Sequence, residues 1–460
     1  MPTRFRLEDP ALAGTLRRIE QAVRRGGGRT WLVGGCLRDL VLGRRPRDLD
    51  IEITGLPPGQ VHAVLAEHFS VQFVGKAFEV FKLQGLPIDI SIPSRPLVDG
   101  TTGPGLARQA DPSMPIDEAL ARRDFTINAM AWDPDTTELR DPFNGRSDLG
   151  AHILRHVGPR FVEDPLRVLR GMQLSARFEL TVAPETVTLC QTLSQDGQPS
   201  ERLWAEWKKL LLQGVKPSIG LHFLRHCGWL RFYPELAALQ DCPQDPAWHP
   251  EGDVWIHTLH CLDWFAAERT GDEQDDLIVG LGVVCHDFGK PHTTIEEYGR
   301  VSSRGHESEG EVPTRRFLER LTNRQDVIDE VLPLVSYHLR PSALFDAKAS
   351  DSAVRRLARQ VKRIDRLVRV ARADHAGRPP KPFDGFPAGE WLMTRAKQLE
   401  VDCRTPTPLV MGRHLLELGV QPGPDMGRLL DDCYEAQLDG TFATLEEGLI
   451  YAKIKLSPSR

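Results

Sequence analysis

Two aspartates near the start of the chain, Asp48 and Asp50, are spaced so that they can hold metal ions. They stand two residues apart in DLDIEI, whose alternating apolar pattern predicts a strand, so both carboxylates project from one face. Paired carboxylates suit Mg²⁺, which keeps several waters and bridges to substrate phosphates. Two such ions can activate an attacking hydroxyl and neutralise a pyrophosphate leaving group. The pair therefore indicates nucleotidyl or phosphoryl transfer, with Asp48 and Asp50 as the catalytic metal ligands.

A diglycine turn before these aspartates is suited to receive phosphates. A predicted strand ends in Gly34 and Gly35, where backbone amides can approach a ligand closely and a following helix offers its N-terminal donors to an anion. Arg38 follows on that helix and can reach the same anion. As a third acid for the metal site, Asp89 on a neighbouring predicted strand is the better candidate and Glu79 the weaker one. An ordinary surface aspartate at a strand end is an equally good interpretation of Asp89.

Together these residues form the pattern GG-x-x-RD-x-x-LG-x-x-x-x-D-x-D, with which the chain resembles the nucleotidyltransferase superfamily. The resemblance is to the bacterial branch that contains CCA-adding tRNA nucleotidyltransferases and poly(A) polymerases. It implies that ARRDFTINAMA is the nucleotide-sugar motif, with Arg123 and Asp124 at the ribose and Asn128 nearby. A free 2′-hydroxyl both donates and accepts hydrogen bonds, so an Asp–Arg pair is a sensible sensor of a ribonucleotide.

A second implied element, DPFNGRSDL, joins the head of the molecule to the region that follows. It matches a D-x-x-x-G-x-x-D-L pattern of the family. The resemblance implies that Asp141, Gly145 and Asp148 form this junction.

The stretch FVEDPLRVLR is similar to the family's E-D-x-x-R motif, which reads the incoming base. The resemblance implies that Glu163, Asp164 and Arg167 choose C and A without a nucleic-acid template, with Arg170 also at the nucleotide. Their spacing predicts pairing along one helix, which would hold a carboxylate and a guanidinium side by side against a Watson–Crick edge. The alternative is a helix N-terminus whose acids only complement the dipole. Arg202, further along, is expected to be structural.

Five segments between residues 254 and 376 carry histidines and aspartates in an order that resembles the HD family of metal-dependent phosphohydrolases. The resemblance implies a cation held by His257, His286, Asp287 and Asp374. This ligand mix suits a divalent transition metal such as Mn²⁺, Ni²⁺ or Co²⁺ better than Ca²⁺. His306 and His338 are expected to serve a second metal or to bind phosphate, and His260 is either an alternative ligand or a packed histidine. Such a site is expected to remove 2′,3′-cyclic or 2′-phosphates that block RNA 3′ ends.

The elements around these motifs predict an α+β chain. A nucleotidyltransferase head with a small mixed β-sheet is followed by an all-α body that contains the HD domain, because short apolar runs give way to helical periodicity near residue 152. Stretches rich in Pro and Gly at 241–253 and 378–389 read as linkers. The expected parts are the head (1–150), a helical neck for RNA binding and base selection (151–240), the HD domain (250–380) and a helical tail (381–460).

Composition excludes several other classes of protein. The 460 residues are 40% hydrophobic and 27% charged, which excludes disorder and fibrous repeats. Without a long apolar run or an apolar start, the expectation is a cytoplasmic protein with no membrane partner. Eight scattered cysteines predict neither a disulfide framework nor a cysteine zinc site. A net charge of −6 argues against indiscriminate coating of nucleic acid, although nine Arg/Lys in 355–378 predict either a local basic groove or a solvated helix face.

These motifs predict template-independent addition of CCA to tRNA 3′ ends, with tRNA, CTP and ATP as partners and Mg²⁺ in the head. The tail, 405–455, is expected either to pack against the tRNA elbow or to cap the HD domain. Poly(A) polymerase, CC-only and A-only addition are alternatives, because the head motifs are shared and the segment 96–118 departs from the family patterns. A hydrolase with a nucleotide-binding head and a non-catalytic RNA-binding protein are disfavoured, because both ligand sets are intact.

Overall fold

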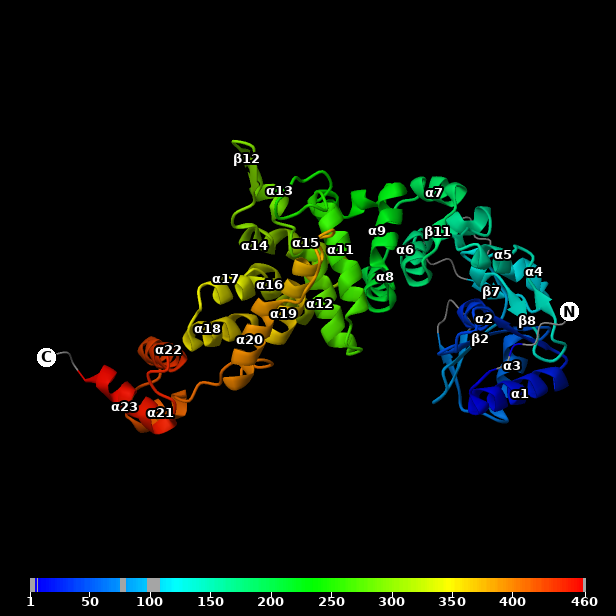
Figure 1. Ribbon diagram of the computed structural model, residues 1–460. Coiled ribbons are helices and arrows are strands. Elements are labelled where there is room, and N and C mark those ends of the chain that lie inside the picture. The colour runs from blue at the N-terminus through cyan, green and yellow to red at the C-terminus, as the bar shows by residue number, and fades with distance from the viewer. Residues whose placement is uncertain (1–4, 6, 75–79, 97–107, 458–460) are drawn as a thin grey trace. The chain divides into compact units, whose positions relative to one another are not determined.

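The computed structural model describes residues 5, 7–74, 80–96 and 108–457, which form two compact units (Figure 1). The first comprises Met1–Leu210 and Ile219–Trp229, and the second comprises Leu211–Ser218 and Leu230–Arg460. The α+β class is confirmed, with a mixed sheet in the first unit and helices in the second. Within the described ranges, no helix is both long enough and apolar enough to cross a membrane. The finer division into four parts stays a prediction.

A seven-stranded sheet forms the base of the first unit, in the order β3-β4-β5-β2-β1-β8-β9. Strands β2 and β5 run parallel, and the other neighbours run antiparallel. The short apolar runs of the head form the predicted strands β1 (Arg29–Val33), β2 (Leu49–Thr54), β3 (Val71–Val74), β4 (Val80–Leu83) and β5 (Ile88–Ser91). The sheet also contains β8 (Ala131–Trp132) and β9 (Leu139–Arg140), which were not predicted.

Side-chain alternation gives strand β2 one apolar and one acidic face. Leu49, Ile51 and Ile53 of β2 are fully buried in a core with α1 (Pro10–Arg25) and α3 (Pro58–Ala66). The opposite face of β2 therefore carries the residues between them, which are acidic. The apolar side chains of β2 anchor the sheet, and its acidic side chains lie on the face where Trp31 and Val33 of β1 join a second apolar cluster.

Short elements and helices complete the first unit. Two further strand pairs are β6 (Ser94–Pro96) with β7 (Arg108–Ala110), and β10 (Ile153–Leu154) with β11 (Thr181–Val182). The helices are α2 (Gly34–Val41), α4 (Ile116–Leu120), η1 (Thr126–Asn128), α5 (Gly145–Gly150), η2 (Pro159–Glu163), α6 (Arg167–Phe178), α7 (Pro184–Gln191), α8 (Ser200–Gln213) and α9 (Pro217–His226), the last two of which cross the boundary between the units.

The implied junction residues hold α5 in place. The amide of Gly145 donates to Asp141 Oδ1 at 2.6 Å, and the Thr126 hydroxyl donates to Asp148 Oδ2 at 2.7 Å. A Cβ on Gly145 would lie 2.2 Å from the carbonyl oxygen of Thr126, so only glycine fits there. The three residues therefore fasten α5 to η1.

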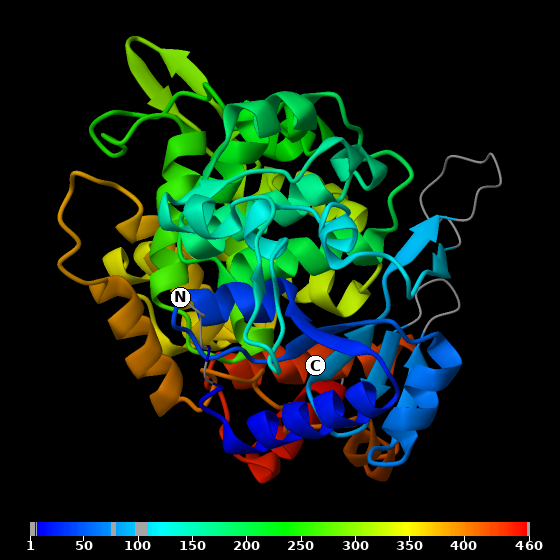
Figure 2. The same ribbon diagram turned by 90° about the vertical axis from the view of Figure 1, so that its right-hand side faces the viewer.

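Helices make up the second unit apart from one hairpin, β12 (Ile295–Glu297) with β13 (Arg300–Ser302), which stands out from them in both views (Figures 1 and 2). The helices are α10 (Pro234–Ala237), α11 (Val254–Ala267), α12 (Glu273–Cys285), α13 (Lys290–Thr293), α14 (His306–Glu309), α15 (Glu311–Leu321), α16 (Gln325–Tyr337), α17 (Arg340–Asp346), α18 (Asp351–Val361), α19 (Ile364–Ala376) and α20 (Pro387–Gln398). The tail adds α21 (Gly412–Glu417), α22 (Pro424–Leu438) and α23 (Leu445–Leu456), which share a small core.

The basic segment 355–378 lies on α18 and α19, and most of its charge is neutralised within the unit. Arg366 pairs with Asp275 at 2.5 Å and with Glu330 at 2.6 Å, and Arg369 pairs with Asp276 at 2.5 Å. Arg363 also pairs with Asp275, and Arg356 and Arg359 pair with Glu435. These ion pairs argue against the predicted basic groove.

Candidate functional site

One face of the sheet gathers the acids that the sequence predicts to bind metal. Asp50 is half-buried on β2, Asp48 is exposed just before that strand, and Asp89 lies beside Asp50 in the register of β2 and β5. Burial raises the pKa of Asp50, Arg123 opposes this, and the charges of Asp48 and Asp89 raise it further. A divalent cation among the three carboxylates would relieve this repulsion, so the residues fit one.

Asp89 also has a partner of its own. Lys82 on β4 faces it in the register, and Lys82 Nζ lies 2.9 Å from Asp89 Oδ1. A cation at Asp89 would have to displace this ammonium group. Both side chains are about half exposed (49% and 47%), and ion pairs this exposed contribute about 1 kcal/mol or less, so the displacement costs little. The weaker candidate, Glu79, lies outside the described residues.

The diglycine turn lies directly against these acids. Gly34 has a φ of +67°, and a Cβ there would lie 3.0 Å from Asp50 Oδ2 and 2.9 Å from Arg123 Nη1. The Gly35 amide donates a hydrogen bond to Asp50. Both glycines open α2, so the amides at the N-terminus of this helix adjoin the acids, as a site for phosphates and metal ions requires.

A buried polar network joins this turn to the predicted sugar motif. Arg38 Nη1 donates to Asn128 Oδ1 at 2.8 Å, and Asn128 Nδ2 donates to Asp124 Oδ1 at 3.2 Å. Arg170 Nε donates to Asp124 Oδ2 at 2.7 Å. Burial opposes the charge of Asp124, but Arg170 and these hydrogen bonds outweigh burial and lower its pKa to about 2. The structure therefore brings four predicted nucleotide-binding residues together.

Arg123 is held by an acid that the sequence analysis did not single out. Arg123 Nη2 donates to Glu52 Oε2 at 3.0 Å, and Glu52 is buried two residues beyond Asp50 on β2. The available signal was strand alternation, because D-x-D continues as D-x-D-x-E along one face.

Three guanidinium groups surround one aromatic ring near the turn, which the sequence analysis also missed. The guanidinium carbons of Arg38, Arg44 and Arg177 lie 4.2, 5.2 and 5.2 Å from the centre of the Phe178 ring. Burial and the charge of Arg38 lower the pKa of Arg177 to about 10. An anion would relieve this crowding of positive charge.

The predicted helical pairing among Glu163, Asp164 and Arg167 is wrong, because α6 begins only at Arg167. Asp164 precedes a proline and is extended, with φ −137° and ψ 99°, as steric contact with a following proline favours. Its Oδ2 accepts a hydrogen bond from Arg202 Nη2 at 2.7 Å. Arg202 therefore orients the carboxylate of Asp164, and its structural role stays a prediction.

Backbone carbonyl groups, rather than acids, position Arg167. Its Nη1 donates to the carbonyl oxygen of Arg160 at 2.8 Å, and its Nη2 donates to that of Arg122 at 2.7 Å. Glu163 accepts a hydrogen bond from Arg160 Nη1 at 3.2 Å. The guanidinium of Arg167 is held firmly, but by contacts that side-chain spacing does not reveal.

The second site lies in the second unit and assembles the first predicted ligand set of the HD motif. His257 comes from α11, His286 follows α12, and Asp374 comes from α19. His257 Nε2 lies 3.4 Å from His286 Nε2 and 3.1 Å from Asp374 Oδ1. Asp287 Oδ2 lies 3.2 Å from His286 Nε2. All four residues are buried, whereas His260 is exposed and lies outside the cluster.

His306 and His338 form a second ligand pair beside the first. Their Nε2 atoms are 3.3 Å apart, and His306 Nε2 lies 3.3 Å from Asp287 Oδ1. Asp287 therefore presents one oxygen to each pair of histidines. This arrangement fits two cations that share one carboxylate.

Each of the four imidazoles is oriented by an acceptor at its Nδ1, which leaves its Nε2 free to face the centre. This is the usual second layer of contacts around metal-binding histidines. The acceptors are Glu251 Oε1 at 2.7 Å for His257, and the carbonyl oxygens of Val283 at 2.8 Å for His286, Ser303 at 2.7 Å for His306 and Val335 at 2.7 Å for His338.

The surroundings of the buried Asp287 carboxylate indicate whether these residues fit a metal ion. Among the described residues, neither of its oxygens has a well-aligned hydrogen-bond donor, although Lys290 Nζ lies 2.7 Å from Oδ2. Burial and the charges of His286 and His306 lower the pKa of His338 to about 3, so this imidazole is neutral, as a ligand must be. The donor set of nitrogens and carboxylate oxygens fits a divalent transition metal.

A pocket opens beside this centre, and cationic and aromatic groups line it. Lys290 and Arg378 lie in its wall with Asp287 and Asp374, and Arg378 Nη2 donates to Asp374 Oδ1 at 2.7 Å. Trp248, 65% exposed, also lines it. The segment 241–253 was predicted only as a linker, because nothing in its composition indicated that Trp248 would line this pocket.

Comparison with known proteins gives two matches to family models. Residues 30–155 match the poly(A) polymerase head domain, and residues 254–370 match the HD domain. The two matched regions contain the acid cluster of the sheet and the histidine cluster, respectively.

Two curated relatives align with most of the chain. A "multifunctional CCA protein" of Laribacter hongkongensis is 38% identical over 372 residues, 78% of this chain and 87% of that protein. A protein of the same name from Xanthomonas oryzae pv. oryzae is 35% identical over 412 residues, 87% of this chain and 95% of that protein.

Solved structures share the fold. A Bacillus stearothermophilus CCA-adding enzyme in complex with CTP matches with a TM-score of 0.66 at 23% identity, over 97% of this chain and 98% of that chain. A Thermotoga maritima CCA-adding enzyme complexed with tRNA matches with a TM-score of 0.57 at 19% identity, over 98% and 97% of the two chains.

Proposed function

The chain belongs to the multifunctional CCA protein family, and from this premise we propose that it adds CCA to tRNA 3′ ends from CTP and ATP. The observation that carries the proposal is the acid cluster of Asp48, Asp50 and Asp89 against the diglycine turn. We propose the cytoplasm as the place of action.

In the head, Asp48 and Asp50 would hold Mg²⁺, with Asp89 as the third ligand. Mg²⁺ bound there supplies activation of the RNA 3′-hydroxyl and charge neutralisation at the departing pyrophosphate. The amides of Gly34 and Gly35 bind the triphosphate, and Arg38 is held near them by Asn128. Arg123 of the sugar motif, anchored on Glu52, lies close to Asp50, where it orients the ribose.

Asp164 and Arg167 would read the base. Arg202 fixes the carboxylate of Asp164, and two carbonyl groups fix the guanidinium of Arg167. A fixed acceptor beside a fixed donor can form complementary hydrogen bonds with a Watson–Crick edge. Arg170, which lies on the next turn of α6 and pairs with Asp124, supports these hydrogen bonds.

Nucleotide incorporation tests the proposal for the head. Labelled CTP and ATP are offered separately and together to a tRNA that lacks CCA, to one that ends in CC, and to a poly(A) primer. We expect two C from CTP on the first tRNA and one A from ATP on the second. Repeated A addition to the poly(A) primer would favour a poly(A) polymerase, and incorporation of only C or only A would favour a partial enzyme.

For the HD domain we propose a phosphohydrolase that removes 2′,3′-cyclic or 2′-phosphates from RNA ends. Transition-metal ions held by the two histidine pairs, Asp287 and Asp374 would supply activation of water. Lys290 and Arg378 bind the phosphate, and Trp248 stacks on the terminal base. Phosphate release from RNA with such ends in the presence of Mn²⁺, Ni²⁺ or Co²⁺ tests the proposal, and no release with any of the three would contradict it.

A further inference from the structure

We propose that Cys261 is a ligand of the metal ion at His257 and His286, which makes this position selective for thiophilic divalent ions such as Zn²⁺, Co²⁺ and Ni²⁺ over Mn²⁺ and Mg²⁺. The inference rests on the HD function proposed above and adds a ligand to that site. It departs from the expectation, drawn from the scattered cysteines, of no cysteine zinc site.

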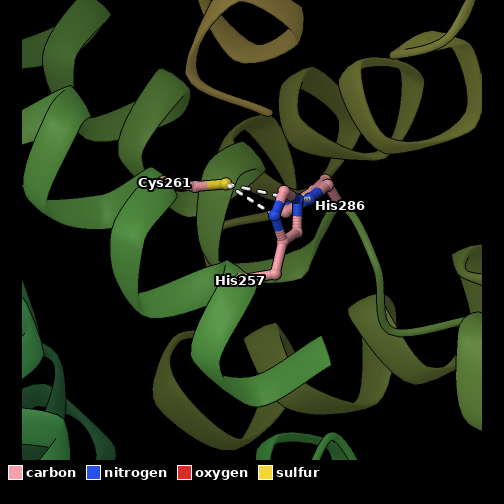
Figure 3. Close-up of side chains that lie close together, drawn as sticks. All are labelled: His257, Cys261 and His286. Atoms are coloured by element: carbon pink, nitrogen blue, oxygen red, sulfur yellow. Dashed lines mark hydrogen bonds between the residues drawn. The ribbon is translucent and has the colours of Figure 1, made fainter. Parts of the chain in front are cut away.

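Two of the three distances among the donor atoms match one tetrahedral ion, and the third is no longer than 4.8 Å. Cys261 Sγ lies 3.4 Å from His257 Nε2, which lies 3.4 Å from His286 Nε2, and all three donors fall within 4.8 Å of one another. Tetrahedral bonds of about 2.0–2.1 Å to nitrogen and about 2.3 Å to sulfur place two nitrogens about 3.3 Å apart and a nitrogen and a sulfur about 3.5 Å apart. Figure 3 shows the Cys261 sulfur pointing toward the two imidazole rings.

The fold aims this sulfur at the centre. Cys261 stands four residues after His257 on α11, so both side chains share one face of the helix. Cys261 is fully buried, and a Cβ on Gly377 would lie 2.3 Å from its sulfur, so glycine makes room for the thiol. The carbonyl oxygen of Gly377 lies 3.1 Å from His257 Nδ1, so the same residue helps to orient the imidazole.

The charged groups around the site favour a thiolate as an additional ligand. Asp374, whose carboxylate lies 3.1 Å from His257 Nε2, pairs with Arg378 at 2.7 Å, and this reduces its donor strength toward a cation. A thiolate adds a strong, soft donor, and a bound divalent ion deprotonates a coordinating thiol. The second position, at His306 and His338, has only nitrogen and oxygen donors in this cluster. The two positions therefore differ in metal preference.

Cobalt spectroscopy of the full-length protein tests the inference. Wild-type protein loaded with Co²⁺ is expected to show a sulfur-to-cobalt charge-transfer band in the near ultraviolet. Cys261→Ser should lose the band and retain bound cobalt at the histidines. It should also bind Zn²⁺ at least about tenfold more weakly while its affinity for Mn²⁺ hardly changes.

The matched control is Cys285→Ala, because Cys285 is buried one residue before His286 but lies outside the donor cluster. This variant should keep the band, and thermal unfolding of both variants checks that they are folded. A band that persists in Cys261→Ser, or wild-type protein that binds cobalt without the band, would overturn the role of Cys261. Wild-type protein that binds no cobalt would overturn the proposed metal site as well.

Discussion

The head and the HD domain hold their acidic ligands in opposite ways. In the head, Asp48 is exposed and Asp50 is half-buried on an open face of a sheet. In the HD domain, Asp287 is 1% exposed and lies among histidines whose outer nitrogens are all oriented by acceptors. The head cluster is incomplete as a metal cage, whereas the HD cluster is nearly complete.

This difference suits the size and charge of what each site receives. An open acid face would leave room for a triphosphate and an RNA end, which would themselves supply oxygens to Mg²⁺, so we expect the metal to bind together with the nucleotide. A closed cluster of imidazoles and carboxylate would hold metal ions without substrate. We therefore expect substitutions in the head to lower the rate of nucleotide addition. Substitutions in the HD domain should lower its metal content, and through it the rate of phosphate release.

The largest effect is expected from Asp50→Asn. Loss of a ligand that faces both the metal and the Gly35 amide should lower nucleotide incorporation by roughly 1000-fold or more. Phosphate release by the HD domain, measured on the same preparation, should stay within about twofold of wild type. Loss of both activities would contradict the independence of the two sites.

Asp287→Asn is expected to have the next largest effect. Because Asp287 faces both histidine pairs, its loss should remove metal from both positions and lower phosphate release by about 100-fold or more. Elemental analysis gives the metal content, and CCA addition by the same variant is the control. Retention of two ions per chain would show that Asp287 is not shared.

Glu251→Gln tests the outer layer of the HD site without touching a donor to the metal. Glu251 orients His257 through Nδ1, and loss of such a partner weakens metal binding by about 10- to 100-fold. Metal affinity is measured by competition with a chelator. Unchanged affinity would mean that the Gly377 carbonyl orients this imidazole sufficiently by itself.

The affinity of the HD site for metal should also decrease as the pH decreases. Burial lowers the pKa of His257, but Cys261, Asp374 and Glu251 outweigh burial and raise it well above 6.5. Below this raised pKa a proton occupies the ring and must leave before metal binds, so affinity should drop by up to about tenfold per pH unit as pH falls. Titration with metal at several pH values measures this, and an affinity that does not change between pH 8 and pH 6 (roughly the range over which a histidine titrates) would contradict it.

Trp248→Ala is expected to have the smallest effect. Loss of a stacking surface should raise the KM for phosphate release roughly fivefold and leave kcat and metal content unchanged. Trp248→Phe keeps an aromatic face and should restore most of the affinity. A fall in kcat with unchanged KM would argue against stacking.

The sequence predicted the parts of both sites that depend on regular periodicity. Strand alternation put Asp48 and Asp50 on one face and brought Asp89 beside them, because β2 and β5 are in register. It did not predict how Asp164 and Arg167 are held. A proline after Asp164 delays the helix, and the partners of Arg167 are backbone carbonyls from other parts of the chain.

The residues that irregular segments contribute to the HD site could not be predicted from the sequence for the same reason. Glu251 and Trp248 come from a segment with no period, and only the folded backbone brings them to the histidine cluster. Cys261 lies four residues after His257, but one such pair in a sequence does not indicate a metal site. The fold supplies the further indication, because Gly377 lies against both residues.

A crystal structure of the full-length protein with CTP and Mg²⁺ tests the central claim most directly. The account predicts Mg²⁺ at about 2.1 Å from carboxylate oxygens of both Asp48 and Asp50, with the triphosphate on the amides of Gly34 and Gly35. A triphosphate bound elsewhere, or Mg²⁺ that contacts neither aspartate, would contradict it.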